Sequence, residues 1–361
     1  MSQKLDLVEL KRHLHKSLVQ LVDATPGEMK KRLQHLAAAD CNWRVSHPIN
    51  ELATTPAALE NLWLPLKAAL PDLERRDFIF VGGVYEGRTY VATVGHYCGT
   101  FRRPWLGIPA TGRPIFLRYG EAYEIRDGRI VQANCLWDIL DFMRQAGFWP
   151  IVPSLGTEGM WPGPFTSNGI VLHATDATQS ADNLAQTLAM HKTLGDYDDR
   201  EGRGRDGLLN MPQKLHWHPK MMWYGPAGIG TTRGLQGFVD YHQLPFRLAF
   251  PNRKGGSQWD QIAEDKRRLG GGHYIHIGDG AYSVTGGWPS VFAVHSGGSF
   301  LGCGATGKVI TMRVMDFYLH DEGLIRENWV PIDMLDILMQ MGVDVFDRMH
   351  SHFNRGDLPA S

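Results

Sequence analysis

Ionisable side chains suited to acid–base chemistry recur in pairs along this chain of 361 residues. Arg118 and Arg313 lie in extended segments, where a cavity-facing arginine can hold a carboxylate or enolate oxygen in bidentate fashion. Asp138 and Asp333 follow the next extended segments. A carboxyl group beside Trp329 and out of water has a raised pKa and can protonate a carbonyl oxygen. Histidines, which can act as bases or orient carbonyls, form two further pairs: His47 with His218, and His96 with His295.

Each of these residues also has a structural explanation. The two aspartates can simply cap the helices that follow them, and Asn134, in place of Trp329, favours the cap at Asp138. The arginines can form ion pairs on the outer sheet face or at a domain contact, and a lone histidine is commonly structural. Two further acids, Glu121 and Asp316, lie on the opposite strand face from the arginines. Only one of these faces can line an interior, and we favour the arginine face.

Two sequence patterns resemble cofactor sites, but the residues around them argue against a cofactor. His216 and His218 would share one strand face, but no carboxylate or cysteine stands beside them at ligand spacing, so we expect no metal. The glycine-rich run 225–230 contains a proline and follows no βαβ unit, which argues against a nucleotide site. We therefore expect no cofactor.

The paired residues belong to a duplicated unit. Residues 107–147 align with 302–342 without a gap, and 14 of the 41 positions are identical. A shorter match upstream relates 64–72 to 244–252 at a different offset, as expected where loops vary in length. One unit of about 150 residues therefore occurs twice, which is typical of a duplicated domain.

In each copy, helices come first, then strands, then a short closing helix. Thr25, Pro26 and Glu28 form the pattern of a helix start with a capping box. Strand-like runs begin near residue 76, and Asp127-Gly128 joins the last two as a hairpin turn. Helices grouped before antiparallel strands predict the α+β class.

Four segments follow from these patterns: a first domain at 1–149, a Pro- and Gly-rich linker at 150–177, a second domain at 178–350 and a tail at 351–361. The formal net charge of −1 disfavours nucleic acids and anionic membranes as partners, and no run is long enough to span a bilayer. The charged N-terminus does not have the pattern of a signal peptide, and the four cysteines suggest no disulfide framework, so we expect a cytoplasmic protein.

The motifs shared by the copies resemble a known family. The pattern T-G-[RK]-x-[IV]-x-[LM]-R, then D/E-G-x-I, then D-x-L-D-x-x-x-Q-x-G resembles the C-terminal half of SnoaL-like polyketide (ester) cyclases. His47-Pro48 and His218-Pro219 resemble the His-Pro of that family's early strand. The resemblance implies the nuclear transport factor 2-like fold, in which a curved antiparallel sheet is closed by helices into a cone around a cavity. We expect two such cones, arranged as an intrachain pseudo-dimer.

The resemblance also implies a function and a set of site residues. It places the family's acid/base aspartate at Asp333 and Asp138, with the second copy the better candidate for an active cavity. The expected reaction is a cofactor-free aldol cyclisation of a hydrophobic, carbonyl-rich small molecule, in which Asp333 donates a proton and Arg313, His218 and His295 orient the substrate. The expected substrate contacts are Trp329, Trp217, Trp288, His47, His96 and Arg118.

Two other functions remain open for this fold. An epoxide hydrolase-like hydratase would need an Asp–Arg–Asp cluster around a water molecule in one cavity. A non-catalytic binding protein would follow if aromatic side chains filled the cavity or if Asp333 only capped its helix. We expect either a monomer with pseudo-dimeric domains or a homodimer.

Overall fold

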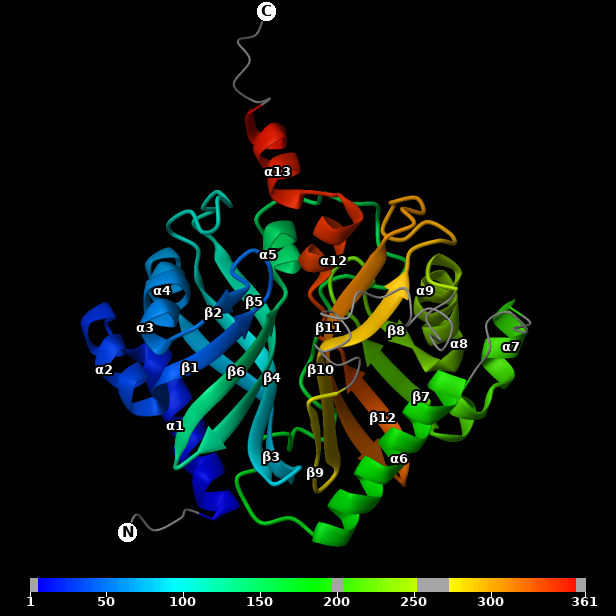
Figure 1. The fold of residues 1–361 in the computed structure, drawn as a ribbon, viewed down its shortest axis with the longest axis horizontal. Helices are drawn as coiled ribbons and strands as arrows, with labels where there is room; N and C mark the ends of the chain where they lie inside the picture. Colours follow the sequence, from blue (N-terminus) through cyan, green and yellow to red (C-terminus); the bar gives the residue numbers. More distant parts are fainter. Residues whose placement is uncertain (1–5, 197–203, 252–272, 355–361) are drawn as a thin grey trace, which may run out of the picture.

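The computed structural model describes residues 6–196, 204–251 and 273–354, and shows two six-stranded sheets with the same strand order (Figure 1). The first domain contains α1 (Leu7–Asp23), α2 (Pro26–Leu36), β1 (Ala37–Val45), β2 (Glu51–Leu52), α3 (Thr55–Ala58), η1 (Leu59–Trp63), α4 (Leu64–Ala69), β3 (Glu74–Tyr85), β4 (Arg88–Thr100), β5 (Pro114–Arg126), β6 (Arg129–Trp137) and α5 (Ile139–Gln145).

The second domain repeats this order. It contains α6 (Ala177–Asp196), α7 (Gly204–Asn210), η2 (Pro212–Leu215), β7 (Trp217–Tyr224), β8 (Thr232–Arg233), α8 (Gly234–Phe238), η3 (Val239–Gln243), α9 (Leu244–Ala249), β9 (Ile275–Asp279), β10 (Tyr282–Val294), β11 (Val309–Asp321), β12 (Leu324–Trp329), α12 (Met334–Met341) and α13 (Val345–Asn354). The expected tail at 351–361 begins inside α13, and its residues 355–361 lie outside the described ranges.

Local sequence signals explain where these elements begin and turn. Thr25 and Glu28 form the predicted capping box at the start of α2. Asp127 and Gly128 both adopt positive φ, as a tight two-residue hairpin turn requires, and they join β5 to β6 as predicted. Asp138 and Asp333 cap α5 and α12, each accepting a hydrogen bond from the backbone of the third residue along.

The α+β class and the duplicated curved sheet are confirmed, with one difference in strand direction. In both sheets β3 to β6, or β9 to β12, are antiparallel neighbours, but β1 runs parallel to β6 and β7 runs parallel to β12. The reason is the helical crossover between the first and later strands, which returns the chain to the far edge before the hairpins begin.

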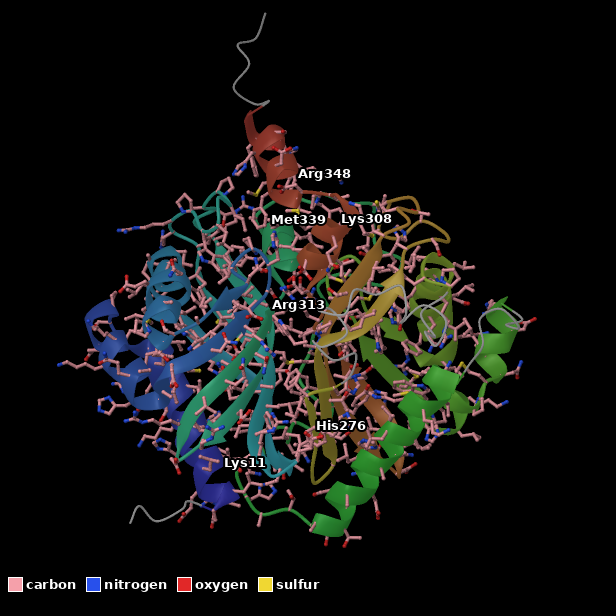
Figure 2. All side chains as sticks on the ribbon, in the orientation of Figure 1. Lys11, His276, Lys308, Arg313, Met339 and Arg348 are labelled. Carbon is pink, nitrogen blue, oxygen red and sulfur yellow. The ribbon has the colours of Figure 1, made fainter. Side chains whose placement is uncertain are left out.

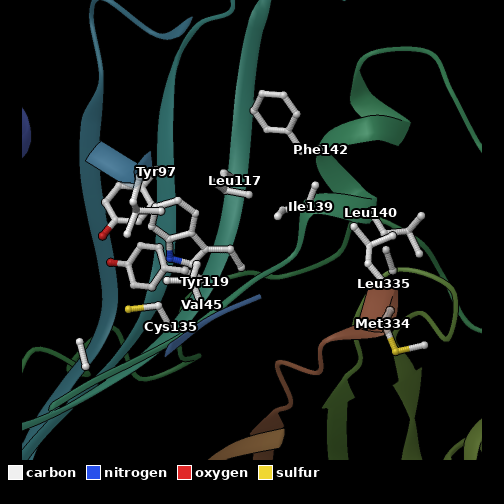
Figure 3. Packing of buried hydrophobic residues seen from close by; sticks show 14 of the residues in the cluster. Val45, Tyr97, Leu117, Tyr119, Cys135, Ile139, Leu140, Phe142, Met334 and Leu335 are labelled. Carbon is white, nitrogen blue, oxygen red and sulfur yellow. The ribbon is translucent and has the colours of Figure 1, made fainter. Parts of the chain in front are cut away.

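The two domains pack with their sheets towards each other, while α1 to α4 and α6 to α9 lie on the two outer flanks (Figure 1). The central layer is apolar and includes Val81, Val284 and Trp329, all almost fully buried. Trp161, from the segment between the domains, is buried in the same layer, with its indole nitrogen 2.9 Å from the Gly225 carbonyl oxygen. At one end Leu140 of α5 lies near Leu335 of α12 (Figure 3). This is the expected intrachain pseudo-dimer.

No helix in the described parts of the chain is long and apolar enough to span a bilayer.

Candidate functional site

A cavity of about 420 Å³ lies inside the second domain, between its sheet and the helices of its outer flank. Its walls come from β7, β10, β11 and β12 on one side, and from α6, α8, α9 and α12 on the other. Most of the lining is apolar or aromatic, for example Trp223, Phe238 and Met312. Such a volume and lining suit an apolar small molecule held by a few polar contacts.

The corresponding interior of the first domain is filled by aromatic side chains. The shared strand registers and helix turns allow the two interiors to be matched position by position. Four large side chains of the first domain are each replaced by a smaller one that lines the cavity: Trp63 by Gln243, Tyr97 by Val291, Tyr119 by Val314, and Trp137 by Ile332. These four replacements account for space in one domain and a packed core in the other.

Among the described residues that line the cavity, Asp316 is the acid. It lies on β11 between Val314 and Tyr318 in the lining, because alternate residues of a strand share one face. Hydrogen bonds from Asn328 and Tyr318 reach its carboxyl group, but burial is the larger influence and raises the pKa of Asp316 to about 7. A carboxyl group with this pKa can donate or accept a proton near neutral pH.

Tyr318 links Asp316 to histidines on the cavity wall. The Tyr318 hydroxyl lies 2.7 Å from Nε2 of His191, which comes from α6. The His191 and His273 rings are 5.3 Å apart and nearly edge to face, and both line the cavity. Burial lowers the pKa of His191 to about 3 and that of His273 to about 4, so both are neutral imidazoles at neutral pH.

In the first domain, Glu121 matches Asp316 but is tied into an ion-paired network. Nη1 of Arg75 lies 2.8 Å from its carboxylate, and the Tyr97 hydroxyl and the Trp137 indole nitrogen each lie 2.9 Å from it. All of these side chains are almost completely buried. The Tyr123 hydroxyl is a third neutral donor to this carboxylate. An acid held by an arginine and three neutral donors in a filled core is structural.

Asp333 and Arg313 do not line the cavity of the second domain; they lie at the interface between the domains (Figure 2). One Asp333 oxygen is 2.9 Å from Nη1 of Arg313 and 2.9 Å from the backbone nitrogen of His47, in the other domain. The other oxygen accepts the capping hydrogen bond from Asp336. Burial raises the pKa of Asp333 to about 7, against the opposing attraction of Arg313.

The first domain contributes the reciprocal contact. Nη2 of Arg118 lies 2.6 Å from Asp138, whose carboxylate accepts a hydrogen bond of 2.9 Å from the backbone nitrogen of Ala227. Both copies therefore use the Arg–Asp pair to bind the opposite domain. The expectation that the arginine face lines the cavity is wrong. That face is buried by the other domain, while the face of Asp316 lines the interior.

The predicted histidines also lie outside this cavity lining. His47 is half-buried in the loop after β1, and the registers match it to Ala227, not to His218. His218 lies near the start of β7, where its Nδ1 accepts a hydrogen bond of 3.0 Å from the Lys220 backbone. The pairing of these two histidines by their His-Pro motif is therefore wrong.

The second histidine pair fails for the same reason. His96 faces Arg118 across β4 and β5, whereas the position opposite Arg313 falls in the irregular stretch between Gly287 and Val291, where the Trp288 ring lies 4.9 Å from the Arg313 guanidinium. His295 follows β10, is fully buried, and lies within reach of the Gly298 carbonyl oxygen at 3.2 Å. The register shift between Gly287 and Val291 moves the strands out of the alignment that the matching letters suggested.

The three tryptophans that were expected to contact substrate lie in two places, the cavity and the domain interface. Trp217 lines the cavity. Trp288 covers Arg313, and Trp329 is buried between the sheets, where its indole nitrogen lies 2.9 Å from the Pro162 carbonyl oxygen. Trp329 therefore belongs to the domain interface and not to the substrate cavity.

Sequence reasoning considered Asp316 and set it aside, and it did not identify Tyr318, His191 or His273 as site residues. A usable signal was present in the repeat. Four aromatic residues in the first copy become smaller residues in the second, and this change marks the face that encloses space. The hydratase alternative receives no support from the cavity. Arg313 does lie between Asp333 and Asp336, but none of the three lines it.

Comparison with known proteins identifies the family of the first domain. Residues 19–146 match the sequence profile of the SnoaL-like polyketide cyclase family. No curated protein matches the chain.

Solved structures match one domain length at a time. IdmH from Streptomyces antibioticus is 22% identical, with 38% of this chain and 99% of IdmH covered and a TM-score of 0.32. TsrD from Streptomyces laurentii is 20% identical, with 40% and 98% covered and a TM-score of 0.32. A SnoaL-like protein from Jannaschia sp. CCS1 is 15% identical, with 39% and 95% covered and a TM-score of 0.32. The first domain matches the SnoaL-like polyketide cyclase family, and the second domain repeats the strand order of the first.

Proposed function

We propose that the second domain is a polyketide cyclase-type enzyme that uses Asp316, without a cofactor, to move protons on an apolar, carbonyl-rich small molecule. The family match of the first domain supports the cyclase type of function. The observation that carries the detail is the position of Asp316, which has its polar neighbours Tyr318 and Asn328 beside it in an otherwise largely apolar cavity.

The proposed reaction is an intramolecular aldol closure. The Asp316 carboxylate removes a proton from a carbon next to a carbonyl group, and the resulting enolate carbon forms a bond to a second carbonyl carbon of the same molecule. The alkoxide oxygen then takes the proton back from Asp316, so the product has the same composition as the substrate. Tyr318 and Asn328 stabilise the charge on Asp316 or on an oxygen beside it.

The apolar walls contribute by positioning. An extended molecule confined with its reacting carbons in contact no longer has to find that geometry in solution, which is a large share of the barrier to ring closure. Trp217, Trp223 and Phe238 supply flat surfaces for conjugated rings. No step requires Arg313 or Asp333, which hold the domains together.

The test is turnover of a panel of aromatic β-keto esters, followed by mass spectrometry. Cyclisation leaves the substrate mass unchanged, whereas a hydratase would add one water. We expect Asp316→Asn to lower the rate by about 100-fold or more, as for loss of a general acid–base group. Binding of the same ester, followed by fluorescence of Trp217 and Trp223, should persist.

Asp333→Asn is the matched comparison, because asparagine keeps the helix cap and the domain contact can adjust. We expect this variant to keep its rate within about tenfold. An Asp316→Asn enzyme of full activity, or an Asp333→Asn enzyme that loses the rate while remaining folded, would contradict the assignment of Asp316.

A further inference from the structure

We propose that Asp316, Tyr318 and His191 form a proton relay in which the ionisation state of Asp316 sets the tautomer of His191. This inference deepens the proposed function of the same cavity and rests on it for its purpose, but its test needs no substrate.

The geometry places the three side chains one after another. Asp316 and Tyr318 are two residues apart on the same face of β11, which brings the Tyr318 hydroxyl within reach of the Asp316 carboxyl group, and that hydroxyl lies 2.7 Å from Nε2 of His191. One hydroxyl has only one proton to donate, so Tyr318 cannot donate to both neighbours at once. The direction of one hydrogen bond therefore fixes the direction of the other.

Two arrangements satisfy every donor and acceptor in the line. With Asp316 ionised, Tyr318 donates to the carboxylate, and Nε2–H of His191 donates to the Tyr318 oxygen. With Asp316 protonated, its hydroxyl donates to the Tyr318 oxygen, and Tyr318 donates to a bare Nε2, so that His191 carries its proton on Nδ1. To change from the first state to the second, Nε2 passes its proton to Tyr318, Tyr318 passes its own to Asp316, and Nδ1 takes one from solvent or a neighbour.

The surroundings keep His191 neutral in both arrangements. Burial lowers its pKa to about 3, and His273 and His276 lower it further in the same direction. Among the described residues, Asn328, Tyr318 and Thr285 from the sheet face Asp316, and His273 and His276 face His191. His242 and Arg247 line the same cavity. The relay therefore titrates as one carboxyl group and not as an imidazolium.

The same histidines offer a path for the proton that His191 exchanges. Nδ1 of His273 lies 3.2 Å from Nε2 of His276, and His276 is half-buried near the junction of the domains (Figure 2). Its ring lies 4.9 Å from that of Tyr85, in the first domain. These ring contacts lead from His191 towards the junction of the domains, and we expect them to be the route of proton exchange.

The experiment is nitrogen NMR of the full chain labelled with ¹⁵N-histidine, because protonated and bare imidazole nitrogens have well-separated shifts. The His191 signals are assigned by their loss in His191→Gln. We expect Nε2 of His191 to change from protonated to bare as the pH falls through the Asp316 midpoint near 7, with no imidazolium. In Asp316→Asn and in Tyr318→Phe the tautomer should not change between about pH 5 and pH 9.

His320, two residues beyond Tyr318 on the same strand, is an internal control. Its Nε2 lies 3.0 Å from the Ser283 hydroxyl and 3.1 Å from that of Thr187, and its hydrogen-bond partners do not include Asp316 or Tyr318, so its shifts should be the same in all variants. A single His191 tautomer at every pH, or conversion to imidazolium near pH 6 to 7, would overturn the relay. A protein that switches but converts no β-keto ester would refute the cyclase proposal alone.

Discussion

The two domains share a fold and a strand register, but the acid at the same strand position has opposite surroundings in each: a packed, ion-paired core in one and a cavity in the other. Glu121, in the first domain, is packed among aromatic rings and ion-paired with Arg75. Asp316, in the second, faces a cavity of about 420 Å³, with only neutral hydrogen-bond partners among the influences on its pKa. The domain that carries the family sequence match is therefore the filled one, and the domain with space is its partner.

This difference indicates which properties a duplicated fold can divide between its two copies. A filled core with a neutralised acid contributes stability, and an open core with a protonatable acid contributes chemistry at the cost of stability. The first domain also supports the site of the second from outside. Its His47 backbone binds Asp333, which caps α12, and α12 contributes Met334 and Ile337 to the cavity wall.

The largest expected effect is the loss of Arg75. In Arg75→Met, both Asp77 and Glu121 lose their cation in a buried site, which should lower the free energy of unfolding by about 3–5 kcal/mol. Urea denaturation gives the value. The neighbouring Arg76→Met removes a solvent-exposed pair with Glu74 and should leave the free energy of unfolding nearly unchanged, because solvent screens such pairs. Equal effects of the two variants would show that the first-domain network is not the stabilising centre described above.

The second-largest expected effect on stability is that of a variant that opens the filled core of the first domain. Trp137→Ile copies the second-domain residue into the first domain and removes a fully packed ring together with the donor to Glu121. We expect a loss of about 2–4 kcal/mol in the free energy of unfolding. Trp149→Ile, at a half-buried site, should cost clearly less. A Trp137→Ile protein as stable as the parent would mean that the first core tolerates a cavity.

The pH dependence of stability should differ in sign between the domains. The pKa of Asp316 is raised to about 7 by burial, so between its ordinary value and about 7 the folded state binds more protons than the unfolded state, and stability falls as pH rises. Burial opposes ionisation of Asp77 too, but Arg75 and hydrogen bonds lower its pKa overall, so its contribution is lost as pH falls below the ordinary value.

The measurement is unfolding free energy against pH for the parent and for Asp316→Asn. The difference between the two curves should have a slope of at most about 1.4 kcal/mol per pH unit, the limit for one proton. Asp333, whose pKa is also raised to about 7, keeps a similar slope in both proteins. Parallel curves would show that Asp316 is already ionised throughout this range.

The smallest effect on stability should come from filling the open cavity. Ile332→Trp introduces the first-domain residue where space exists, so we expect a change of about 1 kcal/mol, at the low end for overpacking. Binding of the apolar dye anilinonaphthalene sulfonate, followed by fluorescence, should be lost. Dye binding that survives this substitution would place the dye outside the cavity.

Much of the scaffold could be predicted because it depends on local chemistry. The capping box at Thr25, the hairpin at Asp127-Gly128 and the caps at Asp138 and Asp333 each depend on a few adjacent residues. The site was harder to predict, because β11 is buried on both faces. Helices cover the face of Asp316, and the other domain covers the face of Arg313, so polar residues on either face looked equally internal.

The sequence by itself determined the duplication, the order of helices and strands, and the resemblance of the first domain to its family, because repeats, turns and caps are local sequence patterns. The tertiary structure alone decided which face of β11 encloses space, which histidines correspond, and which aspartate binds the other domain. Those outcomes depend on strand register and on the volume of side chains that meet across the core, and neither is a property of neighbouring residues in the chain.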